Sequence, residues 1–400
     1  MSMAASHLFS PRHLFSPRHV FWSLAFRPLF FLAALLAVVA MGTWLVMLNS
    51  TWITLRPALP LLLWHIHEML FGFGFTVAAG FLLTAAQNWT GLRSPHGVYL
   101  MVLAGLWLLI RALLWLDVPA IALILAQAIW WLMVIVGLGI LLIPANSRRN
   151  YQFLPILVVI ASLNLCFLWF AAQEQDALAV HLARSALLVF CLVMGIVGGR
   201  VIPMFTRNVV PHSNVRATPR LNWVLLFFSI LGACAYLLHG VVPSPVSPAW
   251  VLMLVAVLHL IRLAHWGGWH CRHEPLLWSL HLSYLALGLG LGFFGLAHTG
   301  YWFGQSEALH LITVGAMGFM ILSMISRVSL GHSGRPLRVS KVMAIAFGLM
   351  AAAACVRVLL PLFDWLLLGW NLSGLLWIAA FSLFLLAYVP VLTGPDLRHR

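Results

Sequence analysis

The sequence predicts an all-α, multi-pass membrane protein with about twelve transmembrane helices. Hydrophobic residues make up 63% of the 400 positions and charged residues 8%, whereas a typical soluble domain has about 25% charged residues. The apolar residues gather in stretches of roughly 20 residues, the length at which a helix crosses a bilayer. We place these stretches near residues 27–48, 61–86, 98–116, 120–143, 153–172, 178–200, 222–240, 250–267, 275–297, 307–329, 341–361 and 370–392.

Turn-forming sequences support several boundaries between these stretches. Gly, Pro, Asn and Ser favour turns because they adopt or stabilise backbone conformations that helices exclude. Such sequences follow the second, fourth, seventh and tenth stretches, as Asn88-Trp89-Thr90-Gly91, Pro144-Ala145-Asn146-Ser147, Pro243-Ser244-Pro245 and Gly331-His332-Ser333-Gly334. The chain therefore forms one membrane domain, residues 25–393, with short loops and no room for a separate soluble module.

The positive charges indicate how the helices are oriented. Most of the 22 Lys and Arg residues fall before the first stretch, after the even-numbered stretches or at the C-terminal end, and Arg56 lies in a loop on the other side. Cytoplasmic loops carry the excess of Lys and Arg, so both termini are predicted to be cytoplasmic and the number of helices to be even. This topology explains the net charge of +14 better than nucleic-acid binding does.

The two ends of the chain are predicted to be short cytoplasmic tails, residues 1–24 and 394–400. The first tail contains an exact duplication, His7-Leu8-Phe9-Ser10-Pro11-Arg12 followed by His13-Leu14-Phe15-Ser16-Pro17-Arg18. It lacks the short apolar core and cleavage site of a signal peptide, so we expect a flexible segment whose role is open. The five cysteines are scattered, which indicates neither a disulfide framework nor a zinc or iron–sulfur site.

Ionisable side chains recur near the outer ends of the predicted helices, where each is costly unless it faces a bundle interior, a water cavity or a metal. They are His65, His67, Glu68, Arg111, His181, Arg184, Glu307, His310 and Arg357. Imidazole is the commonest metal ligand in proteins, so this layer predicts a metal or haem site with His65, His67, His181 and His310 as candidate ligands. His281, nearer the cytoplasmic side, is a fifth candidate. For any one histidine, a hydrogen-bonded structural role is the alternative.

Helix geometry suggests how the layer is organised. His65 and His67 are two residues apart, so they point about 200° apart and are expected to serve different roles. Glu68 follows His65 by three residues, and Glu307 precedes His310 by three, so each pair should share a helix face. A carboxylate there could orient a ligating imidazole. Arg111, Arg184 and Arg357 could neutralise haem propionates, because guanidinium groups bind carboxylates through paired donors.

The chain resembles the NnrS family over about residues 20–393. The resemblance depends on these segments: Phe26-Arg27-Pro28, Trp64-His65-Ile66-His67-Glu68-Met69-Leu70-Phe71-Gly72, Asn88-Trp89-Thr90-Gly91, Gly198-Gly199-Arg200-Val201-Ile202-Pro203-Met204-Phe205-Thr206-Arg207-Asn208, Glu274-Pro275-Leu276-Leu277-Trp278, His310 with Thr313-Val314-Gly315-Ala316-Met317-Gly318, and Arg327-Val328-Ser329-Leu330-Gly331-His332-Ser333-Gly334-Arg335-Pro336. Ser333 stands where threonine is expected.

This resemblance implies a bacterial inner-membrane protein that contains haem and copper and acts in the response to nitric oxide. It does not say which histidine binds which metal. Twelve helices with histidines on the second, sixth and tenth also resemble the catalytic subunit of haem–copper oxidases at the level of the fold, although its ligand motifs are not reproduced.

Three functions follow as hypotheses. The first is protection against nitrosative stress by binding or turning over nitric oxide at a haem or metal site in the bundle. The second is a twelve-helix transporter for a metal or small anion, although no inverted repeat or pair of broken helices is evident. The third is a di-iron carboxylate site, which the eight acidic residues of the chain make hard to assemble, because such sites use about four carboxylates.

Overall fold

The computed structural model describes residues 16–50, 56–242, 247–300 and 304–397, and within them the chain is all-α. The first copy of the duplicated hexapeptide, the start of the second and Pro243-Ser244-Pro245 lie outside the described residues. All twelve predicted spans are confirmed as helices, and we call them spans 1 to 12 in chain order. They are α2 (Phe26–Asn49), α3–η3–α4 (Leu61–Ile66, His67–Gly74, Phe75–Thr90), α5 (Val98–Leu113), α6 (Ala120–Leu142), α7 (Phe153–Ala172), α8 (Asp176–Val209), α9 (Pro219–His239), α10 (Ala249–Ala264), α11 (Pro275–Ala297), α12–η6–α13 (Gln305–His310, Leu311–Gly318, Phe319–His332), α14 (Lys341–Leu359) and α15 (Leu366–Thr393).

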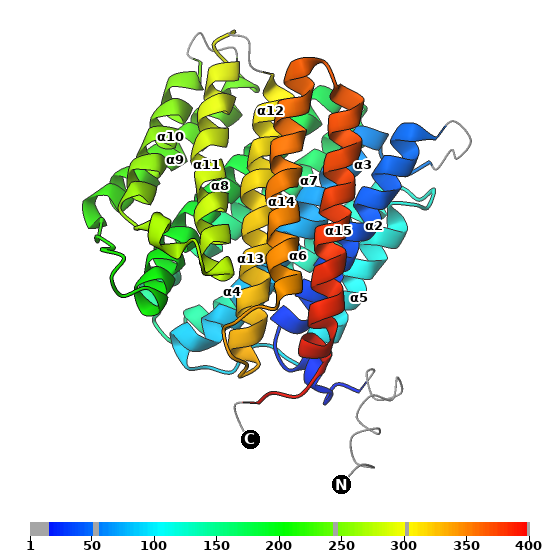
Figure 1. Ribbon diagram of the computed structural model, residues 1–400. Coiled ribbons are helices and arrows are strands. Elements are labelled where there is room, and N and C mark those ends of the chain that lie inside the picture. The colour runs from blue at the N-terminus through cyan, green and yellow to red at the C-terminus, as the bar shows by residue number, and fades with distance from the viewer. Residues whose placement is uncertain (1–15, 51–55, 243–246, 301–303, 398–400) are drawn as a thin grey trace.

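Ten of these helices, among the described residues, are long and apolar enough to cross a membrane, while α5 and α10 are shorter apolar helices. Consecutive spans run in opposite directions, so odd-numbered spans end at the upper end of the bundle in Figure 1 and even-numbered spans end at the lower end. The first span begins and the last span ends at the lower end, as an even number of crossings requires.

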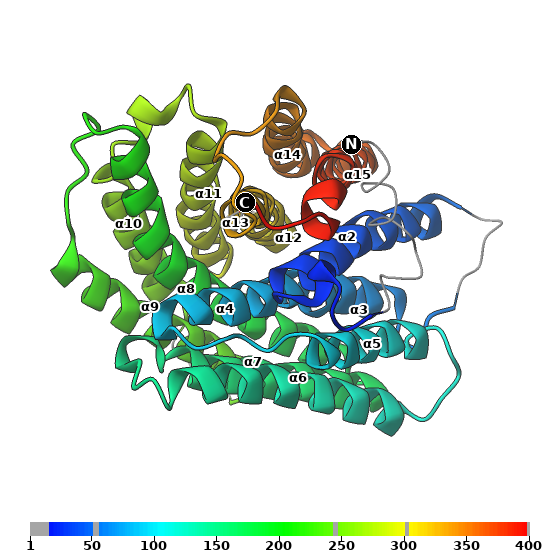
Figure 2. The ribbon, with the colours of Figure 1, turned by 90° about the horizontal axis from the view of Figure 1, so that it is seen from below.

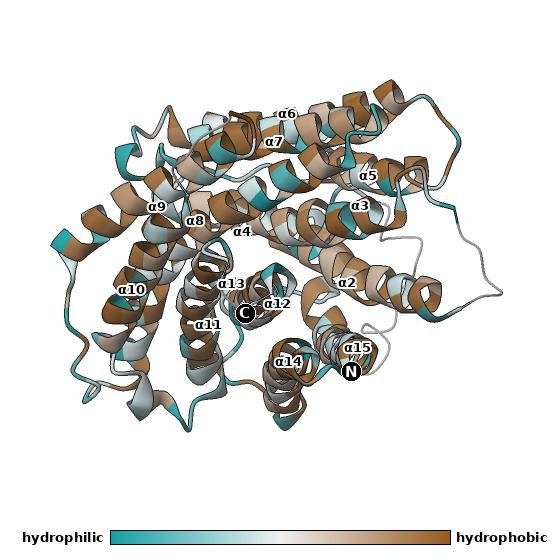
Figure 3. Cartoon of the chain, turned by 90° about the horizontal axis from the view of Figure 1, so that it is seen from above, coloured by the Kyte–Doolittle hydropathy of each residue, from teal (hydrophilic) through white to brown (hydrophobic). Residues whose placement is uncertain are grey.

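The outer surface of the bundle is apolar in a regular pattern. On α6, large aliphatic residues at helical spacing are each 48–60% exposed: Ile121, Leu125, Ile129, Leu132, Val136 and Ile140. Figure 3 shows hydrophobic residues along most of each helix and hydrophilic residues gathered mainly in the connecting loops. A continuous exposed apolar face of this kind suits contact with lipid rather than with water.

Three spans form the interior of the bundle, and they are spaced four apart in the chain. In each of spans 2, 6 and 10, 78% of the most apolar window is buried, compared with at most 56% in the other long spans. The three contact one another: α8 touches both η3 and η6, and α4 touches α13. Figure 2, which looks along the bundle, shows α4, α8 and α13 near its middle. These spans carry His65, His67, His181 and His310.

The first and last spans close the bundle. α2 packs along α15, and the Arg27 guanidinium at the start of α2 donates to the carbonyl oxygens of Leu392, at 2.7 Å, and Gly394, at 2.8 Å. A cation at the C-terminal end of a helix satisfies carbonyls that lack intrahelical partners. Phe21 and Trp22, in the short helix η2 (Val20–Trp22), are also buried, so packing begins before the first span.

Several helices are longer than the stretches that hydropathy predicts, among them spans 2, 6, 10 and 12. α8 continues to Val209, and its 34 residues amount to about 51 Å at 1.5 Å per residue, so it extends beyond the hydrocarbon core at the lower end. The tenth span continues to His332 because Gly331 remains helical and the chain turns only after it. Window averages miss such extensions because polar residues can continue a helix outside the bilayer.

Candidate functional site

Spans 2 and 10 each contain an eight-residue π-helical segment in the upper half of the bundle. These are η3, His67–Gly74, and η6, Leu311–Gly318. π-helical turns are rare and often mark functional sites. Each segment begins beside a candidate ligand, because His67 is the first residue of η3 and His310 directly precedes η6. Each widened turn changes which residues share a face of the helix, so these segments position the histidines differently from regular α-helices.

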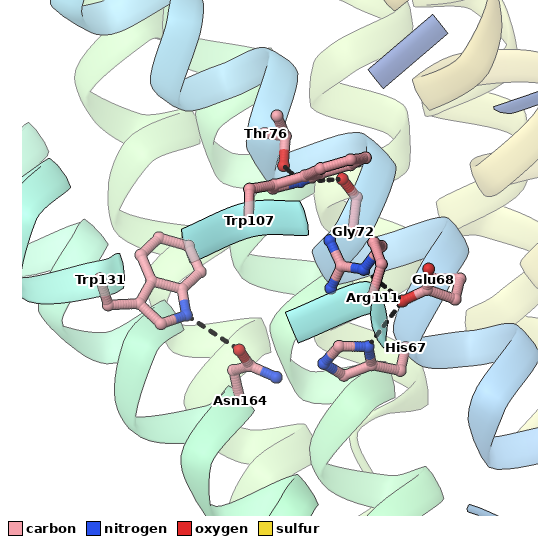
Figure 4. Close-up of polar contacts among 8 residues, drawn as sticks. All are labelled: His67, Glu68, Gly72, Thr76, Trp107, Arg111, Trp131 and Asn164. Carbon is pink, nitrogen blue, oxygen red and sulfur yellow. Dashed lines mark hydrogen bonds and ion pairs between the residues drawn. The ribbon is translucent and has the colours of Figure 1, made fainter. Parts of the chain in front are cut away.

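In span 2, Glu68 binds two partners at the start of the π-helical segment (Figure 4). Its Oε1 atom lies 3.0 Å from Nδ1 of His67 and 3.1 Å from Nε of Arg111 on α5. A carboxylate beside a guanidinium only accepts hydrogen bonds, so Nδ1 of His67 carries the proton and Nε2 keeps its lone pair. The expectation that the Glu68 carboxylate orients the His65 imidazole is therefore wrong. Residues three apart share a face of an α-helix because it turns by about 100° per residue, and the π-helical segment does not keep that angle.

Small residues on span 2 create the space for this arrangement. A Cβ atom on Gly72 would lie 2.8 Å from Leu36, 3.3 Å from Oε1 of Glu68 and 3.4 Å from Cζ of Arg111. The Trp107 indole donates to the Gly72 carbonyl at 3.2 Å and to the Thr76 hydroxyl at 2.8 Å. The Arg111 guanidinium packs over the Trp107 ring, 4.7 Å from its centre. α5 is thus fixed against span 2 with Arg111 directed at Glu68.

His67 faces the fourth and fifth spans. Its ring is buried and lies 6.1 Å from that of Phe167 on α7, and Gln127 on α6 is close to it. Beside this region the Trp131 indole donates to Oδ1 of Asn164 at 2.9 Å, which joins α6 to α7 (Figure 4). His67 therefore lies in a separate environment from His65, as their two-residue spacing predicts.

His65 points toward spans 1, 10 and 11 instead. Its ring stacks on that of Trp44 of α2, 4.2 Å between centres, and it is close enough to His310 and Arg357 to interact with them electrostatically. Histidines from spans 2 and 10 thus share one region beside an arginine of α14. We call His65, Glu307, His310 and Arg357 the His65–His310 group.

Arg357 connects the members of this group. Its Nη2 atom donates to the Ser306 hydroxyl at 3.0 Å and lies 3.0 Å from Nδ1 of His310, and its Nη1 atom lies 3.9 Å from Oε1 of Glu307. Nδ1 of His310 is also 2.7 Å from the Ser306 carbonyl. Because a carbonyl only accepts, that nitrogen carries the proton, and Nε2 is the acceptor that lies 3.4 Å from Nη2 of Arg357. The predicted closeness of Glu307 and His310 is realised around Arg357.

His181 and Arg184, near the start of α8, lie beside this group. Arg184 donates to Oε1 of Gln305 at 3.0 Å, one residue before the hydroxyl that Arg357 binds. The His181 ring stacks on Tyr236 at 4.7 Å, and its Nε2 donates to the Leu237 carbonyl at 3.1 Å. The structure therefore brings Arg184 to the edge of the layer and holds His181 against α9.

His281 is not part of the layer. It lies toward the lower end, where its Nε2 atom is 3.0 Å from the Thr206 hydroxyl and 3.7 Å from Sγ of Cys271. Cys271 is buried, and burial raises the pKa of its thiol. His281 therefore belongs to a small local cluster with Thr206 and Cys271.

A second buried polar cluster was not expected from the sequence. Nδ1 of His259 lies 2.7 Å from the Tyr284 hydroxyl, and the Arg262 guanidinium donates to the same hydroxyl and, at 2.7 Å, to the Gly195 carbonyl. All three side chains are buried. The signal that could have found them is the spacing of His259 and Arg262, three residues apart on one helix face.

The layer at the upper end contains several buried nitrogen atoms that lack a hydrogen-bond partner among the described residues. They are Nδ1 of His65, Nε2 of His67, Nη2 of Arg111 and Nη1 of Arg357. An unpaired buried polar group costs about 1–3 kcal/mol or more, so native proteins pair nearly all of them with protein, water or a bound group. The layer therefore has unused donors and acceptors in two places, around Glu68 on spans 2 and 3 and in the His65–His310 group.

Within the described part of the chain, no three His, Cys, Asp or Glu side chains lie close enough to hold a metal ion together. The donors of the layer instead occur singly or in pairs on separate spans. A family model described as NnrS protein matches residues 20–396 of the chain. A search of curated proteins finds no match.

Proposed function

The chain belongs to the NnrS family, and from this premise we propose that it protects a bacterium against nitrosative stress at a haem or metal centre in the upper half of the bundle. The family is a multi-pass membrane family associated with the response to nitric oxide. The proposed action is to bind or turn over nitric oxide inside the inner membrane.

The observation that carries this proposal is that unpaired buried nitrogens lie beside two arginine–carboxylate pairs, Arg111 with Glu68 and Arg357 with Glu307, at one depth of the bundle. Charged groups are expensive inside a bilayer and are typically retained for function. Ordinary helix packing does not need Arg111 and Arg357 to have unpaired buried nitrogen atoms. A bound group with acceptor oxygens and a metal would pair them.

The donor set fits a haem better than a closed metal cluster. A haem iron needs one imidazole nitrogen with a free lone pair and cations for its propionates. His65 or His310 would hold the iron, because both histidines face one region and His310 already donates through Nδ1. Arg357 and Arg184 are the candidate propionate partners, with Arg111 beside His67. When bound, a haem iron with an open coordination position supplies the site at which nitric oxide binds.

His67 is a candidate ligand for a separate centre. Its hydrogen bond to Glu68 has the pattern in which a carboxylate fixes the tautomer of a ligating imidazole. We assign no ligand set to copper, because the described residues contain no group of three suitable side chains. His181 and His281 are left out of the proposed centre, because the contacts of their Nε2 atoms lie outside the His65–His310 group.

The proposed topology places both termini in the cytoplasm and the layer near the outer face. The start of the first span and the end of the last lie at the lower end in Figure 1, and most loops with several arginines join spans there. The positive-inside rule then assigns the lower end to the cytoplasm. An accessibility assay on single cysteines introduced near residues 95 and 300 would test this assignment, since only the second should react from the outside.

Spectroscopy of the purified full-length chain tests the proposed function. Protein expressed in haem-replete cells should show a Soret band that shifts on titration with nitric oxide. A preparation with neither haem nor transition metal would refute the proposal. Uptake of a metal or anion into vesicles by protein lacking any cofactor would support the alternative, a twelve-helix transporter.

A further inference from the structure

A pocket lies where the three innermost spans meet, below the polar layer. Its wall is formed by residues 77–82 of α4, 190–197 of α8 and 317–324 of span 10, and its volume is about 60 Å³. Each of the three spans contributes four of the twelve lining residues, and all twelve are apolar. The pocket therefore lies where spans 2, 6 and 10 meet.

We propose that this pocket binds a small uncharged gas molecule. The apolar lining offers no hydrogen bond, and a buried water needs two to four polar partners, so water is a poor occupant. An ion would lose its hydration without compensation. The volume admits a molecule of a few heavy atoms, and apolar protein cavities of this kind stay dry and bind xenon or small hydrocarbons.

Methionines give the pocket an adaptable wall. Met194, Met317, Met320 and Met324 all line it, and each is buried. Thioether side chains are unbranched and polarizable, so they can rearrange around a small occupant at low cost. Gly74, the last residue of η3, leaves room for one of them, because a Cβ atom there would lie 3.0 Å from Sδ of Met317.

The pocket is adjacent to the layer that carries the histidines. Met317 lies within η6, seven residues after His310, which corresponds to about 10 Å along a helix. Ala78, Phe81 and Val197 are half-buried, so the pocket opens on their side. Uncharged gases favour hydrocarbon over water, so a gas dissolved in the bilayer could enter without crossing polar surface.

The identity of nitric oxide as the natural occupant depends on the proposed function, but the gas site itself does not. Xenon binding needs neither haem nor nitric oxide. A protein without a Soret band would therefore contradict the proposed function and leave the pocket untouched. A protein with haem but no xenon site would contradict the gas site and leave the proposed function untouched.

Xenon binding to purified full-length protein, measured by ¹²⁹Xe NMR in detergent, tests the inference. We expect one saturable site in the wild type that is weakened at least roughly tenfold by Val193→Phe, because the added ring fills the pocket. The matched control is Val136→Phe on the lipid-facing side of α6, where Val136 is 48% exposed. It should leave xenon binding unchanged.

Ala78→Leu on α4 fills the same pocket independently. Its xenon binding tests the inference if Val193→Phe fails to fold. Folding is checked for each variant by a monodisperse size-exclusion profile. Absence of saturable xenon binding in the wild type, or equal binding in a folded filled variant and the wild type, would overturn the inference.

Discussion

His67 donates a hydrogen bond to Glu68, its direct neighbour in the chain, across 3.0 Å in the buried part of span 2. Neighbouring residues on a regular helix point about 100° apart and rarely meet. Here the contact occurs at the first residues of a π-helical segment. The same carboxylate oxygen lies 3.1 Å from Nε of Arg111, so a single acid neutralises a cation and fixes the tautomer of a histidine.

Replacing Glu68 with Gln should destabilise the protein strongly. The amide would leave Arg111 as a buried cation with no counter-ion, and breaking a buried pair from one side costs about 3–5 kcal/mol. The thermal unfolding midpoint in detergent should therefore fall well below that of the wild type. Glu274→Gln, at an exposed acid, is the control and should leave the midpoint unchanged. Equal midpoints for both variants would mean that Glu68 is not a structural counter-ion.

Gly72→Ala should also lower the unfolding midpoint. The added methyl group would meet Leu36 at 2.8 Å and crowd Glu68, and overpacking of this kind typically costs about 1–3 kcal/mol. Gly105→Ala on α5 is the matched control, because its Cβ would have nothing within 4 Å. Alanine is the better helix former by about 0.5–1 kcal/mol, so this control should keep or raise the midpoint. A Gly72→Ala variant as stable as the control would contradict the packing described around Arg111.

Hydropathy and charge were sufficient to predict the architecture of the chain. Twelve spans and an even topology follow from apolar length and from the side on which arginines collect, because the bilayer imposes both. The burial of spans 2, 6 and 10 adds what hydropathy cannot give, since Leu facing lipid and Leu facing another helix have the same hydropathy. Whether the bundle follows the haem–copper oxidase arrangement stays a prediction.

The sequence predicts the depth of the polar layer in the bundle, but not which of its side chains contact one another. His65, His310 and Arg357 were placed at one level from the sequence, and they meet because spans 2, 10 and 11 pack there. The prediction that Glu68 pairs with His65 is wrong because no sequence pattern distinguishes a π-helical turn from an α-helical one. His259 and Arg262 share a helix face, but the sequence does not show that both contact Tyr284, which lies more than 20 positions later.

Alanine at His65 or His310 should lower the haem content of purified protein by roughly tenfold, in line with the loss expected when a ligand or its close support is removed. Haem per mole of protein, measured as the pyridine haemochrome, gives the result. His212→Ala is the control, because His212 is exposed at the lower end. Equal haem content in all three variants would exclude the His65–His310 group as the haem site.

Tyr284→Phe should destabilise the bundle without disturbing the upper layer. The phenol is the shared partner of His259 and Arg262, and its removal leaves both with an unmet hydrogen bond in a buried site, at a cost of about 1–3 kcal/mol. The unfolding midpoint should fall, while haem content stays at the wild-type value. Tyr151→Phe is the control, since its hydroxyl makes only long, exposed contacts of 3.4 Å. Loss of haem in Tyr284→Phe would instead connect this cluster to the proposed centre.

His298, just beyond the end of α11, should make stability depend on pH. Burial lowers the pKa of this imidazole, and the nearby charges of Arg184, His239 and His181 lower it further. The unfolded chain, with a His pKa near about 6.5, therefore binds more protons than the folded chain in mildly acidic solution. The contribution of His298 to the free energy of unfolding is therefore fully present above about pH 6.5 and is lost as the pH falls below that value. The unfolding midpoint should decrease from pH 8 to pH 5.5, and His298→Asn should reduce this decrease. His265→Asn, at a half-buried histidine near the lower end, is the control and should keep the wild-type slope. Identical slopes in wild type and His298→Asn would show that His298 is protonated without cost in the folded protein.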